Sequence, residues 1–291
     1  MKIVLFSRQR VSHTASDLRL LLTEIELRGY EYIVNQEFAP ILRETIGLQV
    51  PQMNIYGEDV GDQPSDTVMI CIGGDGTLLE GVHRLSGREI VVVGINSGRL
   101  GFLTCVSRSG ITELFDTMER CELRIESRSM LAVKGGFSGG EWLMAANEFS
   151  VQRQGASMIA VATSVDGEAV ATYHGDGVVV ATPTGSTAYS LSVGGAVVSP
   201  QCECWIISPI APHNITMRPI MLPDCCTIEM SIKMREGDAA ISLDNRTYPI
   251  GGGDQVVIRR AKCNFYLGLN GNISFYQTLR DKMMWGVDLR G

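Results

Sequence analysis

The chain has 291 residues, 45% of them hydrophobic and 20% charged, which is typical of a soluble globular protein with one large domain or two. Its formal net charge of −7 argues against a protein that binds nucleic acid electrostatically, but not against one that binds nucleotides in a local nest of amides. No apolar run approaches the roughly 20 residues of a membrane span, and the apolar N-terminal run is too short for a secretion signal, so we expect a cytoplasmic protein with no membrane partner.

The N-terminal part of the chain alternates buried strands with amphipathic helices. Strands are predicted at Lys2–Phe6, Glu31–Val34, Thr67–Ile72 and Ile90–Ile95. Helices are predicted from the N-cap Thr14 to Gly29, and then over Ala39–Leu48, Thr77–Leu85 and Ile111–Arg120. In the first helix, Glu24 and Arg28 are interpreted as an i,i+4 pair on a solvated face. The alternation predicts an α/β domain with a mostly parallel sheet.

Three glycines and one aspartate lie at the turn that joins the third predicted strand to its helix. The segment reads Ile-Gly-Gly-Asp-Gly-Thr from Ile72 to Thr77. Glycine lets a phosphate approach the backbone closely, and the start of a helix favours an anion. A carboxylate repels the phosphate that such a turn attracts, so Asp75 is predicted to hold Mg²⁺ or to take a proton. The alternative is an ordinary turn in which Asp75 caps the helix.

From about residue 125 the pattern changes to short β-rich runs that are separated by glycine pairs. The dipeptide Asp166-Gly167, between the runs Met158–Val165 and Glu168–Tyr173, predicts a hairpin. Further strands are predicted at Val178–Ala181, Cys204–Ile207, Thr227–Met234, Ala239–Leu243 and Gln255–Arg259. These runs predict a second, all-β domain of the sandwich kind.

The tail returns to helical spacing over Phe275–Trp285 and is predicted to pack on the first domain. We therefore predict an α/β domain of residues 1–125 and 268–291, and a β-rich domain of residues 126–267. The eight cysteines include no C-x-x-C pair, which argues against a structural metal site, and in a large cytosolic chain free thiols are favoured over disulfides. No protein ligands of a metal are assigned.

Three further motifs follow the glycine turn in chain order. They are Gly-Ile-Asn-Ser-Gly-Arg-Leu-Gly-Phe-Leu at Gly94–Leu103, Ala-Asn-Glu-Phe at Ala146–Phe149, and the hydroxyl-rich Thr182–Ser190. Together and in this order, the motifs resemble those of the NAD kinase (ATP–NAD kinase) family. The resemblance covers most of the chain, from Thr67 to Trp285.

The resemblance implies an enzyme that transfers the γ-phosphoryl group of ATP to the 2′-hydroxyl of the adenosine ribose in NAD, which gives NADP. It implies a divalent cation, usually Mg²⁺, held mainly by the ATP phosphates. It also implies an α/β domain, a β-sandwich-like domain, a C-terminal helix that returns to the first domain, and assembly as a homodimer or homotetramer. NAD and ATP are then the expected small-molecule partners, with no nucleic acid.

The resemblance also implies roles for individual residues. Asp75 matches the proposed base for the 2′-hydroxyl. The phosphate-binding positions are Gly73, Gly74, Gly76 and Thr77. The NAD-binding positions are Asn147, Glu148, His174, Asp176, Thr184, Thr187, Ala188, Tyr189 and Ala211. His213 lies in a loop that is expected at a subunit interface.

The chain departs from the family pattern at two places. Asp244-Asn245-Arg246 stands where Asp-Gly-Gln is frequent, which keeps a hairpin turn but leaves a ligand role open. His174 stands where many members have arginine. Two alternatives to an NAD kinase remain: a lipid or sugar kinase with a related glycine turn, and a non-catalytic regulator that binds NAD(P).

Overall fold

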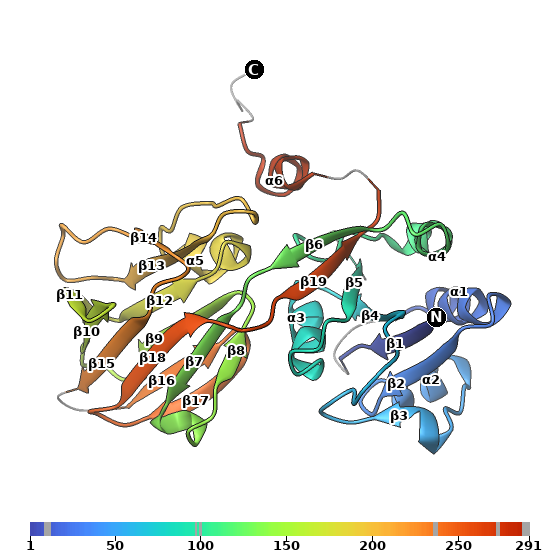
Figure 1. Cartoon of the computed structure of the whole chain (residues 1–291), viewed down its shortest axis with the longest axis horizontal. Coiled ribbons are helices and arrows are strands. Elements are labelled where there is room, and N and C mark those ends of the chain that lie inside the picture. Colours follow the sequence, from blue (N-terminus) through green and yellow to red (C-terminus); the bar gives the residue numbers. More distant parts are fainter. Residues whose placement is uncertain (9–12, 97, 99–100, 235–237, 272–273, 287–291) are drawn as a thin grey trace. The chain divides into compact units, whose positions relative to one another are not determined.

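The chain folds into two compact units, described here from a computed structural model (Figure 1). The structure describes residues 1–8, 13–96, 98, 101–234, 238–271 and 274–286. One unit comprises Met1–Ser127 with Phe265–Gly291, and the other comprises Arg128–Asn264. In the motif at Gly94–Leu103, Ser97, Arg99 and Leu100 lie outside the described residues.

The first unit is built on a seven-stranded sheet with the strand order β3-β2-β1-β4-β5-β19-β6. Its strands are β1 Lys2–Phe6, β2 Glu31–Asn35, β3 Ile55–Tyr56, β4 Thr67–Gly73, β5 Val91–Asn96, β6 Arg124–Arg128 and β19 Phe265–Leu269. The pairs β1–β2, β1–β4, β4–β5, β2–β3 and β5–β19 are parallel. The predicted α/β fold is therefore confirmed, and β19, which we did not predict, returns the chain to this sheet.

Helices cover both faces of this sheet (Figure 1). They are α1 Ala15–Leu27, α2 Ala39–Ile46, α3 Asp75–Arg84 and α4 Ile111–Glu119. The C-terminal helix, α6 Phe275–Met283, belongs to the same unit but does not cover a face of the sheet. Helices α1, α2 and α4 bury Leu18, Leu42 and Leu114 in one core cluster on the sheet. Helix α3 packs on the opposite face, where a Cβ at Gly81 would overlap the Cys71 sulfur at 2.4 Å. Because β4 ends at Gly73 and α3 begins at Asp75, the start of α3 lies at the carboxyl end of β4.

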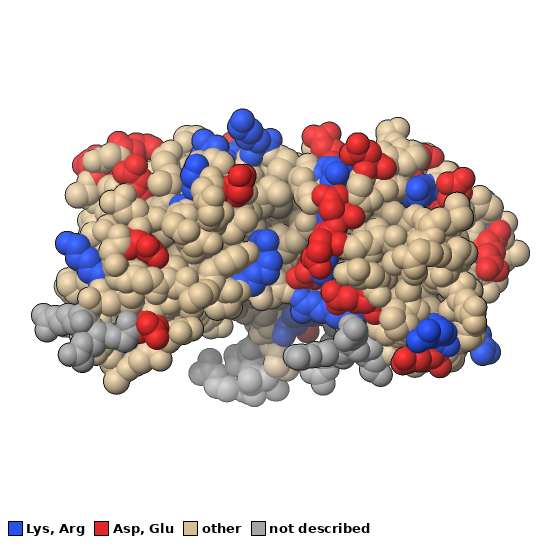
Figure 2. Space-filling view, turned by 90° about the horizontal axis from the view of Figure 1, so that it is seen from below, with Lys and Arg blue, Asp and Glu red and all other residues tan. Residues whose placement is uncertain are grey.

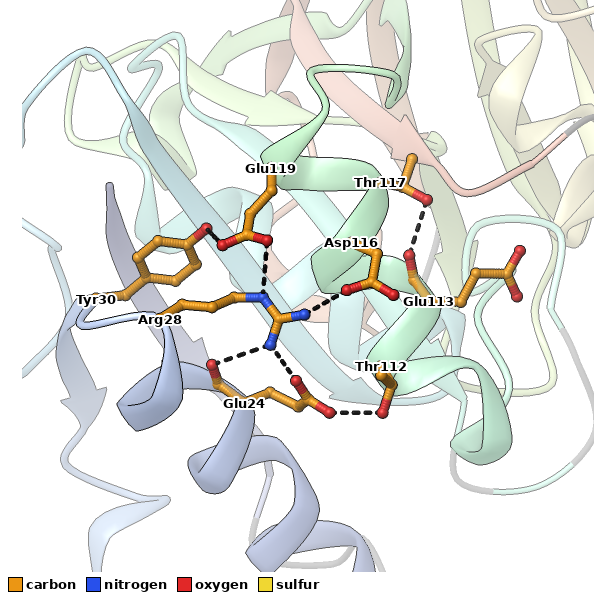
Figure 3. Close-up of polar contacts among 8 residues, drawn as sticks. All are labelled: Glu24, Arg28, Tyr30, Thr112, Glu113, Asp116, Thr117 and Glu119. Atoms are coloured by element: carbon orange, nitrogen blue, oxygen red, sulfur yellow. Dashed lines mark hydrogen bonds and ion pairs between the residues drawn. The ribbon is translucent and has the colours of Figure 1, made fainter.

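The interpretation of Glu24 and Arg28 as a solvated helix face is wrong, although the pair itself forms. The Glu24 and Arg28 side chains are only 8% and 13% exposed. Arg28 also pairs with Asp116 and, at 3.4 Å, with Glu119 on α4, so it joins α1 to α4 (Figure 3). Helical spacing could not reveal this, because the acidic partners are about 90 residues further along the chain.

The second unit consists of two six-stranded antiparallel sheets. The first has the order β11-β10-β15-β18-β7-β8, with β7 Leu131–Gly135, β8 Leu143–Ala145, β10 Ile159–Val165, β11 Glu168–Gly175, β15 Ile228–Met234 and β18 Gln255–Arg260. The second has the order β14-β13-β12-β9-β16-β17, with β9 Glu148–Arg153, β12 Gly177–Ala181, β13 Cys204–Ile210, β14 Ile220–Pro223, β16 Ala239–Leu243 and β17 Arg246–Ile250.

The two sheets enclose one apolar core, which confirms the predicted sandwich. Val133 and Met230 of one sheet share this core with Phe149, Val178 and Trp205 of the other. The predicted hairpin is formed by β10 and β11, whose ends pair Val165 with Glu168. Asp166 and Gly167 take the positive φ angles, 49° and 83°, that such a turn requires.

Basic side chains do not form a continuous surface on the face seen in Figure 2, where lysines and arginines are scattered among aspartates and glutamates. Oppositely charged side chains also form ion pairs: in the first unit, Arg84 pairs with Glu37 at 3.1 Å and with Glu80 at 3.2 Å. Among the described residues, no helix is both long enough and apolar enough to cross a membrane.

Candidate active site

The glycine turn lies at the carboxyl end of β4, where Gly74 caps α3 and Asp75 is the first helical residue. Gly73 has a φ of 155°, and a Cβ there would overlap the buried Thr77 side chain at 2.5 Å. Apart from Gly74 itself and its two chain neighbours, no described residue has a heavy atom within 4 Å of the corresponding position at Gly74. The exposed side of the turn therefore offers backbone to a ligand, while Thr77 supports it from within.

The Asp75 carboxylate does not cap its own helix but binds the segment that follows β5. Its Oδ1 accepts hydrogen bonds from the Leu103 amide at 3.2 Å, the Thr104 amide at 3.0 Å and the Thr104 hydroxyl at 2.8 Å. Its Oδ2 accepts one, from the Phe102 amide at 2.8 Å. A carboxylate has about four acceptor sites over two oxygens, so Oδ2 keeps capacity for a further donor.

Arg8, which the sequence analysis missed, lies beside the glycine turn. Its Nη1 is 3.7 Å from the position that a Cβ would take at Gly76, and its Nη2 is 3.5 Å from Glu80 on α3. The parallel sheet places the end of β1 next to that of β4, and this placement brings Arg8 to the turn. A guanidinium here adds positive charge to that of the helix start.

In the second unit, the Asn147-Glu148 motif lies against the hydroxyl-rich motif. The Asn147 carbonyl accepts from the Thr182 amide at 2.9 Å, and the Thr182 hydroxyl donates to the Ala146 carbonyl at 2.6 Å. A Cβ at Gly185 would lie 2.1 Å from the Asn147 carbonyl oxygen, so only glycine allows this approach. The structure therefore brings these two predicted motifs together.

Asn147 and Glu148 are each only 9% exposed. In the described part of the chain, Oδ1 of Asn147 and Oε2 of Glu148 are buried without a hydrogen-bond partner. Burial raises the pKa of the Glu148 carboxyl to about 8, the nearby Asp244 carboxylate adds to the rise, and an amide hydrogen bond from Tyr189 opposes it. Buried polar atoms without a partner are costly, and here they mark a place where a ligand can supply the missing bonds.

The hydroxyl-rich motif forms a 3₁₀ turn over Thr184–Thr187 and a short helix, α5, over Tyr189–Ser192. Thr187 and Ala188 are half-buried in this segment, and the Thr184 hydroxyl accepts from the buried Arg128 at 3.2 Å. Arg128 is a second residue that the sequence analysis missed. Arg128 and Thr184 are 56 residues apart in the sequence, so no local motif indicates this contact.

Tyr189 lies within the electrostatic influence of Asp176. The Tyr189 hydroxyl donates to the Gln152 side chain at 3.2 Å, and Arg153 pairs with Asp176 at 2.6 Å. Burial raises the pKa of Tyr189, and the Asp176 and Glu148 carboxylates add to the rise. Tyr189, Asp176 and Glu148 therefore share one electrostatic environment.

His174 and Ala211 lie at the neighbouring ends of β11 and β13. The His174 side chain is exposed, and its carbonyl accepts from the His213 amide at 2.8 Å. Asp176 donates its amide to the Ile210 carbonyl at 3.0 Å, and Ala211 has a φ of 42°. The backbone thus holds Asp176 next to the Ala211 loop.

Among the described residues, no cluster of three or more histidine, cysteine or carboxylate side chains could hold a metal ion. All eight cysteines are free thiols, and Cys71 is fully buried. The side chains described here therefore do not fit a preassembled cation site.

Comparison with known proteins relates both units to one family. Models of the N-terminal and C-terminal domains of ATP-NAD kinases match residues 56–122 and 146–268. The NAD kinase of Cytophaga hutchinsonii is 35% identical over 272 residues, which cover 93% of each chain. The NAD kinase of Bacteroides fragilis is 34% identical over 295 residues, which cover all of both chains.

Two solved structures are similar over nearly the whole chain. Yeast NADH kinase complexed with NADH has a TM-score of 0.86 at 21% identity, covering 100% of this chain and 89% of that one; at this identity the likeness shows the fold alone. An NAD kinase from Archaeoglobus fulgidus in complex with ATP has a TM-score of 0.73 at 25% identity, covering 98% and 99% of the two chains.

Proposed function

Because this chain belongs to the NAD kinase family, we propose that it transfers the γ-phosphoryl group of ATP to the 2′-hydroxyl of the adenosine ribose of NAD. The products are NADP and ADP. The observation that carries the proposal is the pair of buried, unpartnered oxygens on Asn147 and Glu148, next to the Thr184–Tyr189 segment. Hydroxyl and amino groups of an adenosine are suitable donors for such oxygens.

Asp75 acts in this proposal as the general base. The 2′-oxygen attacks the γ-phosphorus, the bond from that phosphorus to the bridging oxygen of ADP breaks, and the hydroxyl proton passes to Asp75. Oδ2 is the receiving atom, because it holds one hydrogen bond in the fold whereas Oδ1 holds three. The bonds to Oδ1 fix the carboxylate in place.

The glycine turn holds the phosphate chain of ATP. Gly73, Gly74, Gly76 and Thr77 form the turn, and its open side at Gly74 lets phosphate oxygens reach the amides. Arg8 adds a positive charge beside Gly76. In this proposal the phosphates of ATP would hold the divalent cation, which would supply stabilisation of the negative charge on the transferred phosphoryl group.

NAD is bound by residues of the β-rich unit. Asn147 and Glu148 bind the adenosine ribose and adenine, and the segment with Thr184, Thr187, Ala188 and Tyr189 binds the rest of the nucleotide. Asp176, His174 and Ala211 are proposed for the nicotinamide end. Their support is the shared environment of Tyr189, Asp176 and Glu148, and the backbone link from Asp176 to the Ala211 loop.

We assign NAD binding and oligomerisation to residues 126–267, and the glycine turn to the α/β domain of residues 1–125 and 268–291. A homodimer or homotetramer is proposed, because Ile215, two residues after His213, is 85% exposed, and Met221 on β14 is 50% exposed. Edge strands such as β14 also benefit from being covered. A cytoplasmic location is proposed in keeping with the free thiols.

The test is incubation of purified protein with Mg-ATP and four acceptors: NAD, NADH, diacylglycerol and fructose 6-phosphate. We expect phosphorylation of NAD and none of the lipid or the sugar. A lipid or sugar kinase would show the opposite pattern, and a non-catalytic regulator would bind NAD without forming NADP. Either of those results would overturn the proposal.

A further inference from the structure

Asp244 closes the turn between β16 and β17, and its carboxylate gathers three consecutive amides. Its Oδ1 accepts from the Asn147 amide at 2.7 Å and the Glu148 amide at 3.1 Å, and its Oδ2 accepts from the Ala146 amide at 2.9 Å. The Asp244 amide in turn donates to the Glu148 carbonyl at 2.9 Å. Four hydrogen bonds therefore tie this one residue to a segment almost 100 positions earlier in the chain.

We propose that Asp244 is a positioning residue for NAD, which holds the Ala146–Glu148 backbone so that the free oxygens of Asn147 and Glu148 face the dinucleotide. This inference rests on the proposed function. Without the carboxylate, the three amides would lose their common acceptor, and the segment could turn its side chains away from the ligand. The residue acts through Asn147 and Glu148 and touches no reacting atom.

The choice of a carboxylate here has a cost that a purely structural turn would avoid. Its negative charge lies near the Glu148 carboxyl and adds to the rise in the pKa of that group. The turn itself needs only a residue that tolerates the φ of 52°, and asparagine or glycine would serve. What asparagine cannot do is accept from all three amides, because its amino group would face one of them as a donor.

The turn at Asp166 offers a matched control in the same unit. Asp166 also closes a β-hairpin, has a φ of 49°, and accepts one amide hydrogen bond, from Thr227 at 2.8 Å. The variants to compare are Asp244→Asn, Asp244→Gly, Asp166→Asn and Asp166→Gly. Both replacements suit the positive φ at both positions, so backbone strain is equal in the two pairs.

The measurements are the dissociation constant for NAD by calorimetry, KM for NAD and for ATP, and the melting temperature. We expect both Asp244 variants to weaken NAD binding by about tenfold or more, with KM for ATP changed by less than about twofold, while the Asp166 variants bind NAD as the wild type does. In Asp244→Asn, the pH dependence of NAD binding should also move to lower pH, because Glu148 loses a nearby negative charge.

Unchanged NAD affinity and an unchanged pH profile in Asp244→Asn, with a loss of melting temperature larger than in Asp166→Asn, would reduce Asp244 to a stabiliser of the turn. Asp244→Asn decides the matter even if Asp244→Gly does not fold, since it keeps two of the three acceptor contacts. A wild-type protein that does not bind NAD would overturn the proposed function and this inference together. If the wild type binds NAD and both Asp244 variants bind it equally well, this inference alone is overturned.

Discussion

Asp75 serves the fold and, in our proposal, the reaction, and the two tasks use different oxygens. The sequence predicted an unusual carboxylate in a glycine turn, because the strand, the glycines and the helix are all local signals. It did not predict that Phe102, Leu103 and Thr104 would bind this carboxylate, since those amides lie 27 to 29 positions away. Contacts at that separation depend on the sheet that sets β5 beside β4.

Replacing Asp75 by asparagine should lower kcat by ~10²–10⁴, the usual range for losing a positioned acid–base group. NAD affinity should stay near that of the wild type, because the proposed contacts to the dinucleotide other than the one at the 2′-hydroxyl are made by different residues, Asn147, Glu148 and the Thr184–Tyr189 segment. Initial rates and calorimetric NAD binding, measured on the same preparation, check both parts.

A matched variant separates the base from the loop that it holds. Thr104→Val removes the hydroxyl that donates to Asp75 and accepts from Asn96 at 2.7 Å, but leaves the carboxylate in place. We expect a stability loss of about 1–2 kcal/mol and less than a tenfold loss of kcat. If Thr104→Val is as inactive as Asp75→Asn, loss of the loop explains the effect and Asp75 is not the base.

Glu148 makes stability depend on pH. In the folded protein its pKa is raised from 4.5 to about 8, so between these values the folded state holds a proton that the unfolded state has released. The free energy of unfolding therefore falls as pH rises through this window, by at most about 1.4 kcal/mol per pH unit from this one group. The contribution of Glu148 to the free energy of unfolding is fully present only below the unfolded-state pKa of 4.5.

Glu148→Gln cannot ionise and should show a shallower fall in stability over the same window. Urea unfolding of the wild type and the variant at about pH 5, 6, 7 and 8 measures the difference. Parallel curves for the two proteins would mean that Glu148 titrates normally in the folded state.

At the scale of elements, the local patterns predicted most helices and strands and missed those that only the sheet defines. The Asp166-Gly167 turn and the Thr14 cap were both predicted, and each depends on residues a few positions apart. Strand β19 was missed because the apolar run Phe265–Leu269 is short, and only its pairing with β5 identifies it as a strand. The roles of Arg28, Arg128 and Asp244 were missed for the same reason.

The network around Arg28 should make a measurable contribution to stability. Arg28→Met leaves Glu24, Asp116 and Glu119 without their shared cation, and we expect a loss of about 3 kcal/mol. This is the lower end of the range for a buried pair, because Asp116 and Glu119 are 44% and 47% exposed. Urea denaturation gives the value, and kcat per folded molecule should be unchanged.

Arg120 provides the comparison, because it pairs with Glu122 at 2.7 Å while both side chains are more than half exposed. Arg120→Met should cost less than about 1 kcal/mol, as expected for a surface pair. Equal losses in the two variants would show that the Arg28 network is as solvated as an ordinary surface pair.

At the scale of the whole molecule, the order of elements predicted the fold class. The alternation of strands and helices in the first part of the chain predicted a parallel sheet. The β-rich runs separated by turn residues in the second part predicted a sandwich. The tail was predicted to form a helix, from its spacing, and to return to the first domain; α6 belongs to that unit. The order of strands within each sheet and the burial of Glu148 could not be predicted, because both depend on contacts between residues that are far apart in the sequence.

The assembly proposed for the chain predicts a particle at least twice its mass of 31.7 kDa. Light scattering on the purified protein at micromolar concentration measures this directly. Ile215→Asp should shift the distribution toward smaller particles, because it places a charge on a side chain that is 85% exposed and apolar. An active monomer at that concentration would contradict the proposed homo-oligomer.

The position of the transferred phosphate tests the central claim most directly. The protein is incubated with NAD and Mg-ATP labelled at the γ-phosphate, and the product is examined by phosphorus NMR and with an NADP-specific dehydrogenase. We predict a single new phosphomonoester on the 2′-oxygen of the adenosine ribose, formed by the wild type and nearly absent with Asp75→Asn. Label at another hydroxyl, or no transfer to NAD by a folded wild-type protein, would contradict the account.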